Sequence, residues 1–217
     1  MVELVVFDWN GTLLADTQAM MDAGNLVIKT FGGKPLSRAE YSKAFDFPTM
    51  EFYCKQGSDQ KSMIEGDYVG VFHNHYETRA KKCRTRRGAR GVLKYLQGNS
   101  IKSVILSNHV NDAINEQLRR LDIKDYFHEV LGNRDKSLTA TGRNKVQRIR
   151  DYLDINDVNS EKAIIIGDST EDIEIGKELG MQTIGLTGGY FSTPRLRAHN
   201  PDYMINNLGE LIGIINE

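Results

Sequence analysis

Short apolar runs rich in β-branched residues alternate along the chain with segments whose apolar positions recur at helical spacing. The runs occupy residues 4–7, 103–106, 163–166 and 182–186. Runs of this length and composition are typical of strands buried on both faces of a parallel sheet. Helical patterns occupy residues 88–96, 110–121 and 172–179. Because strands alternate with helices, the pattern predicts an α/β fold with a doubly wound parallel sheet.

Residues 15–87 follow a different pattern, because no buried-strand run occurs among them. Their apolar residues recur at helical spacing: Met20, Met21, Leu26, Val27 and Phe31, then Tyr68, Val69, Phe72 and Tyr76. This periodicity is typical of helices with one buried face. The sequence therefore predicts a small helical domain at 15–87, inserted in a core domain formed by 1–14 and 88–217.

The length and composition fit a soluble globular protein. With 217 residues, the chain has room for one domain with an insertion or for two small domains. Its 28 basic and 29 acidic residues give a net charge of −1, so overall charge predicts neither a nucleic-acid partner nor a membrane partner. The two cysteines, Cys54 and Cys83, form no CxxC pair, and no apolar run reaches the roughly 18 residues of a membrane span. We expect a soluble, cytoplasmic protein.

One local cluster of positive charge lies at 79–90, where seven basic residues occur without an acidic one. A solvated helix face is the favoured interpretation, and an anion-attracting rim beside the insertion is the alternative. Nearby, His73 and His75 are two positions apart and cannot share one helix face. Zinc binding by this pair is therefore not expected, and packing or surface exposure is favoured.

Polar side chains directly follow three of the predicted strands. They are Asp8, Asn10 and Thr12 after the first, Ser107 and Asn108 after the second, and Asp168 and Asp172 after the third. Ligands of open parallel sheets bind beyond the carboxyl ends of the strands, where these residues converge. A lone aspartate after a strand is more often a helix cap or a turn residue, but three strand ends together favour a site. Gathered carboxylates repel one another unless a cation joins them, and oxygen ligands suit Mg²⁺.

These residues match the motifs of a known superfamily. The chain resembles the haloacid dehalogenase superfamily, whose motifs DxDGTL, a strand ending in Ser or Thr, and GDSxxD match residues 8–13, 107–108 and 167–172. The remaining motif is a lysine ahead of the helix that precedes GDSxxD. Lys145, 23 residues before Asp168, fits it better than Lys136 does. Less specific likeness to the phosphoglycolate phosphatase-like branch lies in 121–132, 187–190 and 201–205.

The resemblance implies an Mg²⁺-dependent phosphatase for a small phosphorylated metabolite, with 15–87 as a cap that closes over the active site. It implies that Asp8 is the nucleophile and takes up the phosphoryl group as an aspartyl phosphate. The implied metal ligands are Asp8, the backbone carbonyl of Asn10, and Asp168, with Asp172 beside the ion. The implied substrate-binding residues are Thr12, Ser107, Asn108 and Lys145, of which Lys145 also offsets negative charge.

Asn10 departs from the superfamily pattern, which usually has an aspartate there as general acid and general base. An amide cannot exchange a proton in this way, and the loss of such a group is worth about 10² to 10⁴ in rate. Asn10 still belongs to the predicted catalytic set with Asp8 and Lys145. Two alternatives stay open: a phosphate-binding or regulatory protein with low turnover, and a phosphonatase-like hydrolase, which needs a cap lysine such as Lys34, Lys43, Lys55 or Lys61.

Overall fold

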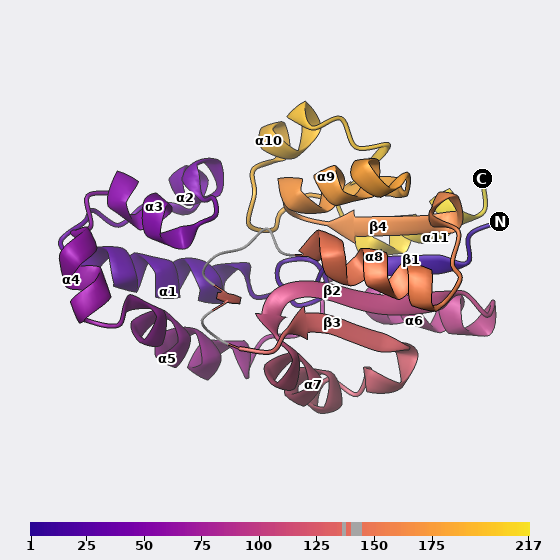
Figure 1. Ribbon diagram of the computed structural model, residues 1–217, viewed down its shortest axis with the longest axis horizontal. Coiled ribbons are helices and arrows are strands. Elements are labelled where there is room, and N and C mark those ends of the chain that lie inside the picture. Colours follow the sequence, from indigo (N-terminus) through magenta and orange to yellow (C-terminus); the bar gives the residue numbers. More distant parts are fainter. Residues whose placement is uncertain (136–137, 140–144) are drawn as a thin grey trace.

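A six-stranded parallel sheet forms the centre of the larger part of the molecule (Figure 1). The computed structural model describes residues 1–135, 138–139 and 145–217. The strands are β1 (Leu4–Phe7), β2 (Lys102–Val110), β3 (Glu129–Asn133), β4 (Ala163–Gly167), β5 (Gln182–Leu186) and β6 (Tyr203–Ile205). Their order is β3-β2-β1-β4-β5-β6, and every neighbouring pair is parallel. The predicted fold class is confirmed.

The two strands that the apolar pattern missed lie at the sheet edges. β3 and β6 are only partly buried, whereas β1 and β4 are buried at every position. An edge strand is covered less completely, so its sequence lacks a continuous apolar run. β2 also extends four residues beyond the predicted end at residue 106.

Helices cover both faces of the sheet (Figure 1). They are α6 (Ala89–Gly98), α7 (Asn111–Arg120), α8 (Lys145–Ile155), α9 (Thr170–Leu179), α10 (Thr193–Ala198) and α11 (Leu211–Ile215). Side chains alternate along β1, so Val5 and Phe7 pack in one apolar cluster with α6 and α7, while Leu4 and Val6 pack in another with α8 and α9. The central strand is thereby fixed from both sides, and its carboxyl end is held in place.

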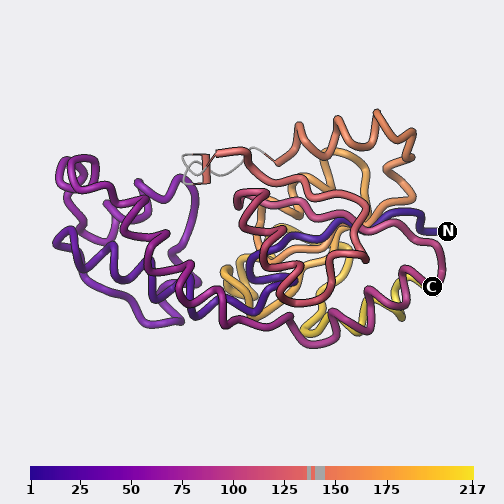
Figure 2. Tube along the Cα trace, turned by 90° about the horizontal axis from the view of Figure 1, so that it is seen from below, coloured from indigo at the N-terminus to yellow at the C-terminus, as the bar shows by residue number. Residues whose placement is uncertain are grey.

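The remaining helices form a lobe beyond the carboxyl ends of the strands, which we call the helical lobe (Figures 1 and 2). It contains α1 (Thr17–Thr30), α2 (Arg38–Ala44), α3 (Thr49–Lys55), α4 (Gln60–Glu65) and α5 (Tyr68–Ala80). Its apolar cluster includes Ile173, Phe191 and Leu196 from the sheet side, so packing is continuous between the two parts. The division at 15–87 into core and cap stays a prediction.

The structure also describes the lengths of the helices and the environment of the two cysteines. Within the described ranges, no helix combines the length and the apolar character needed to span a bilayer. Cys54 and Cys83 are both free and half-buried. The cytoplasmic location stays a prediction.

Candidate active site

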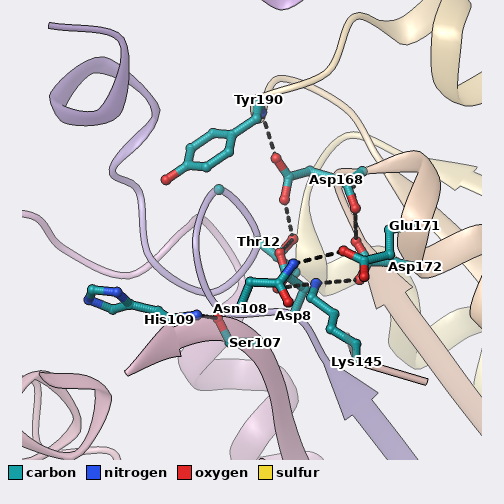
Figure 3. A network of polar contacts seen from close by, with 12 residues as sticks. Asp8, Thr12, Ser107, Asn108, His109, Lys145, Asp168, Glu171, Asp172 and Tyr190 are labelled. Carbon is teal, nitrogen blue, oxygen red and sulfur yellow. Dashed lines mark hydrogen bonds and ion pairs between the residues drawn. The ribbon is translucent and has the colours of Figure 1, made fainter. Parts of the chain in front are cut away.

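Lys145 connects two of the predicted acidic residues at the carboxyl ends of β1 and β4. Its Nζ donates to Asp8 Oδ1 at 2.9 Å and to Asp172 Oδ1 at 2.8 Å (Figure 3). Lys145 is the first residue of α8 and is only 3% exposed. The structure thus brings the predicted lysine to the predicted nucleophile, across 137 residues of sequence. The competitor, Lys136, lies outside the described residues.

Asp168 is held by backbone and hydroxyl donors on both of its oxygens. Thr12 Oγ1 donates to Asp168 Oδ1 at 2.7 Å, and the backbone N–H of Tyr190 donates to Oδ2 at 2.5 Å (Figure 3). A Cβ at Gly11 or at Gly189 would overlap the Asp168 carboxylate. Both loops can therefore approach it only because they carry glycine, and Gly11 also has a φ of +74°.

Asp172 fills two roles at once. Besides pairing with Lys145, it accepts from the Ser169 hydroxyl through Oδ2 at 2.7 Å and from the Ser169 N–H at 3.3 Å. Ser169 and Asp172 form the capping box at the start of α9. Asp172 therefore stands beside Lys145 and the helix start, and its part in metal binding stays a prediction.

The acidic cluster raises the proton affinity of its own members. Burial raises the pKa of Asp8 well above its ordinary value, and Asp172 and Asp168 add to the rise while Lys145 opposes it. Burial likewise raises the pKa of Asp168 to about 6. Burial alone would lower the pKa of Lys145, but Asp172 and Asp8 raise it above its usual range, so the ammonium stays charged. The buried Lys145 ammonium thus contacts two of these three buried carboxylates, Asp8 and Asp172, and the gathered negative charge favours binding of a further cation.

The end of β2 bulges where the second predicted group lies. Between Leu106 and Val110, β2 contains more residues than the stretch of β3 beside it, because Leu106 pairs with Leu131 while Val110 pairs with Asn133. Ser107, Asn108 and His109 on β2 thus lie opposite Gly132 alone on β3, so β2 has two residues more than β3 in this stretch. The Ser107 hydroxyl is buried and accepts from the N–H of His109 at 3.1 Å.

Asn108 is fixed by acidic and amide partners. Its side-chain amide donates to Glu171 Oε2 at 2.8 Å (Figure 3). Its backbone carbonyl accepts from the side-chain amide of Asn133 at 2.7 Å. Arg148 donates to the backbone carbonyls of Ser107 and Leu131, both at 2.9 Å. This support holds the β2 bulge beside Asp8.

Asn10 belongs to a network centred on Asp16, a residue that the sequence analysis did not select. Asn10 Nδ2 donates to Asp16 Oδ2 at 2.8 Å and to the Tyr76 hydroxyl at 2.7 Å. The hydroxyls of Tyr76 and Tyr190 also donate to Asp16 Oδ2, at 2.6 and 2.8 Å, and the Gly11 N–H donates to Oδ1 at 2.7 Å. Burial raises the pKa of Asp16, and these donors oppose the rise. Asn10 therefore acts here as a hydrogen-bond donor to a buried acid.

The segment 79–90 does not form the continuous helix face that was favoured, because α5 ends at Ala80 and α6 begins at Ala89. Most of its basic side chains are exposed, and Arg86 is the exception. Arg86 donates to the backbone carbonyls of Gly11 and Thr187 at 2.8 and 2.6 Å. It joins the loop after β1 to the loop after β5.

Comparison with known proteins identifies the family to which this geometry belongs. The sequence matches the haloacid dehalogenase-like hydrolase family over residues 5–186. The chain belongs to this family. The predicted superfamily and the prediction of an enzyme are confirmed, since the family is one of hydrolases.

The relatives share less than a quarter of their residues with this chain, and they match it over nearly its whole length. A pyrophosphatase PpaX of Listeria welshimeri is 22% identical over 221 residues, which cover 100% of this chain and 97% of that protein. A phosphoglycolate phosphatase of Psychrobacter arcticus is 23% identical over 222 residues, covering 97% and 94%. Among solved structures, a haloacid dehalogenase-like hydrolase from Streptococcus pneumoniae has a TM-score of 0.81 at 20% identity and 98% coverage of both chains. The likeness to the solved structure confirms the fold.

A pocket of about 100 Å³ lies where the helical lobe meets the strand ends of this hydrolase. Its described lining includes Asn10, Asn108 and Tyr190 from the sheet side and Tyr76 from α5. The rest of the lobe side is mostly aromatic or apolar. Asn10 borders the pocket and follows the predicted nucleophile by two residues, so the pocket is the predicted place for the group attached to the phosphate.

The predicted metal site offers only oxygen donors. Within the part of the chain that the structure describes, no three His, Cys, Asp or Glu side chains are arranged around one point. The predicted set does not require three, because it uses the carboxylates of Asp8 and Asp168 and the carbonyl of Asn10. Thr12 Oγ1 touches both carboxylates, at 3.4 Å from Asp8 Oδ2 and 2.7 Å from Asp168 Oδ1, so they lie side by side. Two neighbouring buried carboxylates with oxygen-only donors fit Mg²⁺.

Proposed function

We propose that this hydrolase is an Mg²⁺-dependent phosphatase that forms an aspartyl phosphate on Asp8 from a small phosphorylated substrate. The observation that carries the proposal is the buried Lys145 ammonium, which contacts Asp8 Oδ1 at 2.9 Å beside Asp168 and Asp172. Relatives named phosphoglycolate phosphatase and pyrophosphatase support phosphate esters or anhydrides as substrates.

Each residue of the site has its own role in the proposed reaction. Lys145 orients Asp8 through Oδ1, which leaves Oδ2, with its longer 3.4 Å contact to Thr12, to attack phosphorus. The same ammonium offsets the charge of the phosphoryl oxygens in the transition state. Ser107, at the β2 bulge, contributes a hydroxyl for those oxygens. Bound by Asp8, Asp168 and the Asn10 carbonyl, Mg²⁺ would supply further charge stabilisation.

The first experiment is a phosphate-release screen of phosphorylated metabolites with Mg²⁺ and with EDTA. We expect steady phosphate release with Mg²⁺ and none with EDTA. A phosphate or phosphoester complex that binds tightly without turnover would favour the second candidate, a phosphate-binding protein. That candidate is favoured by one observation, because the Asn10 amide donates to Asp16 and Tyr76 and carries no proton for a leaving group.

The phosphonatase-like alternative has no support in the structure. Of the residues that the structure describes, the pocket lining includes no lysine. Lys34, Lys43, Lys55 and Lys61 are all exposed. An amine that forms a Schiff base must reach the substrate, so these four positions are unsuitable.

Mg²⁺ affinity is expected to fall in acid, because protons and the ion compete for Asp168. The pKa of this carboxyl is raised to about 6, so it is largely protonated below that pH and ionised above it. The apparent dissociation constant for Mg²⁺ should fall as pH rises from 5 to 7 and then level off. Titration calorimetry at fixed ionic strength measures this directly. Asp168→Ala should bind Mg²⁺ more weakly and lose the part of this pH dependence that Asp168 contributes, and a metal response unchanged from the parent would move the site elsewhere.

The Asn10→Asp variant is expected to raise turnover of alkyl phosphates by about 10-fold or more, because a carboxylic acid can protonate the leaving alkoxide. The new carboxyl faces Asp16, and two adjacent carboxylates share a proton, so its pKa is raised and it stays a proton donor at neutral pH. Aryl and acyl phosphates should change much less. Phosphate release across a series of leaving groups checks this expectation.

The double variant Asn10→Asp/Asp16→Asn is the matched control. It exchanges amide and acid and keeps one donor and one acceptor across the 2.8 Å contact. If it matches Asn10→Asp on alkyl phosphates, the acid at position 10 suffices. Intact-mass analysis must first show that Asn10 in the parent has not deamidated. Parent protein that already hydrolyses alkyl phosphates as fast as the variant would contradict the role given to this position.

A further inference from the structure

The pocket beside Asn10 has a chemistry that the family motifs do not determine. We propose that the group it accepts is a compact, uncharged aromatic ring, so that the substrate is a monoaryl phosphate with a phenolic leaving group. This inference rests on the proposed function and deepens it. Size, charge and proton supply each point to the same class of substrate.

The surface of the pocket favours an aromatic ring. Phe45, Phe47, Phe72 and Tyr76 present aromatic rings to it, and the Phe72 and Tyr76 rings stack at 5.6 Å with an interplanar angle of 11°. Aromatic pairs bind a further ring by stacking and edge contacts. An engineered apolar cavity of about 150 Å³ holds one benzene molecule. The pocket volume of about 100 Å³ is of the same order, so the pocket suits a group the size of a single ring.

The charge of the pocket favours an uncharged group. Among the lining residues that the structure describes, none is Lys, Arg, Asp or Glu. His73 and His109 line it, and the Glu77 carboxylate lies 3.8 and 3.5 Å from their ring nitrogens, so an anion placed at these imidazoles would also meet a carboxylate. Behind Asn10 lies the buried Asp16, which adds negative charge. A second anionic group on the substrate, such as the carboxylate of phosphoglycolate, would have no cationic partner among these residues.

The supply of protons at the pocket favours a leaving group that needs no protonation. Asn10 cannot protonate the leaving oxygen, which penalises departure of an alkoxide. A phenol has a pKa of about 10, so a phenolate is a far weaker base and leaves without assistance. The hydroxyls of Tyr76 and Tyr190 both donate to Asp16 Oδ2, at 2.6 and 2.8 Å, so their protons are already bound by a carboxylate and do not serve a leaving oxygen.

The proposed reaction needs no reagent other than water. Asp8 Oδ2 forms a bond to phosphorus, and the bond between phosphorus and the aryl oxygen breaks with its electron pair on the phenolate. The phenolate takes a proton from water. A second water molecule then attacks the aspartyl phosphate, which releases inorganic phosphate and restores the Asp8 carboxylate.

The test compares phenyl phosphate, benzyl phosphate and 2-phosphoglycolate with the full chain and Mg²⁺. We expect kcat/KM for phenyl phosphate to exceed that for 2-phosphoglycolate by at least about 100-fold, since the carboxylate would be desolvated without a Lys or Arg partner among the described lining residues. Benzyl phosphate has the same ring and an alkoxide leaving group, so it should be at least about 10-fold slower than phenyl phosphate. Equal or faster turnover of 2-phosphoglycolate overturns the proposal.

Binding of inert analogues separates this proposal from the proposed function. Calorimetry should show phenylphosphonate binding more tightly than phosphonoacetate. That preference with no turnover of any ester would refute the phosphatase and support the aryl pocket. Tighter binding of phosphonoacetate would refute the aryl pocket, even in a protein that hydrolyses phosphate esters.

Variants locate the preference in the pocket. Val69→Lys puts a cation into the lining and should lower the ratio of kcat/KM for phenyl phosphate over 2-phosphoglycolate by at least about 10-fold. Ile64→Lys, at a residue of the same lobe that is 64% exposed, is the matched control and should leave the ratio unchanged. If Val69→Lys does not fold, Phe72→Leu, which removes one stacked ring at little packing cost, should lower the ratio in the same direction. An unchanged ratio in the folded pocket variant overturns the assignment.

Discussion

Replacing Asp8 with asparagine is expected to reduce phosphate release by at least about 10⁴-fold while the fold is retained. The carboxylate oxygen that attacks phosphorus is lost, and so is one predicted ligand of Mg²⁺. The amide oxygen of the introduced side chain can still accept from Lys145 at the position of Oδ1, so the 2.9 Å contact has a replacement. Burial raises the pKa of Asp8, which means that its ionised form costs free energy in the folded state. The thermal midpoint of the variant should therefore equal or exceed that of the parent.

Asp22→Asn is a suitable control, because this half-buried acid on α1 pairs with Arg79 and lies outside the acidic cluster. It should retain full activity. The two measurements are phosphate release with Mg²⁺ and thermal unfolding. Substantial turnover by a folded Asp8→Asn protein would show that the nucleophile is another residue.

The motif residues were predictable because each chemical role constrains both residue type and strand position. Asp8, Ser107 and Asp168 follow apolar runs that must be parallel strands, and the carboxyl ends of such strands meet at one edge. Lys145 was predicted only through the family resemblance, since a lysine at a helix start is usually exposed. Its burial between Asp8 and Asp172 is what the three-dimensional structure adds.

Other residues of the site could not be identified from local sequence. Asp16 occupies the N-cap position of α1, where an aspartate normally caps the helix, yet its side chain makes no capping bond and accepts from Asn10 instead. Glu171 and Tyr190 reach the site from a helix start and from the loop after β5. Their partners lie 63 and 22 residues away, so no spacing rule reveals them.

The Asp16 network explains why asparagine occupies position 10, where the family pattern has aspartate. An aspartate at position 10 would face a buried carboxylate that already accepts from two tyrosine hydroxyls. The asparagine instead donates to that carboxylate and to Tyr76. The same substitution that removes the proton donor therefore stabilises the junction between the helical lobe and the loop after β1.

Replacing Lys145 with methionine is expected to lower activity by about 10²- to 10³-fold, the usual effect of removing one charge-stabilising donor. It should also destabilise the fold by about 3–5 kcal/mol at neutral pH, because Asp8 and Asp172 are left buried without their ammonium partner. The competing position, Lys136→Ala, should lose far less activity. Phosphate release and urea unfolding measure both effects, and the reverse order of activities would show that the wrong lysine was assigned.

The stability of Lys145→Met should depend on pH in a defined direction. Without the ammonium, the folded-state pKa of Asp8 rises further above its unfolded value, so the folded protein binds more protons than the unfolded chain. The free energy of unfolding should then increase as pH falls through the raised pKa and decrease as pH rises. Adding Asp8→Asn to Lys145→Met removes one buried charge and should recover much of the stability at neutral pH without recovering activity. If the double variant is no more stable than Lys145→Met at pH 7, the buried contact between Lys145 and Asp8 is not what stabilises this end of the sheet.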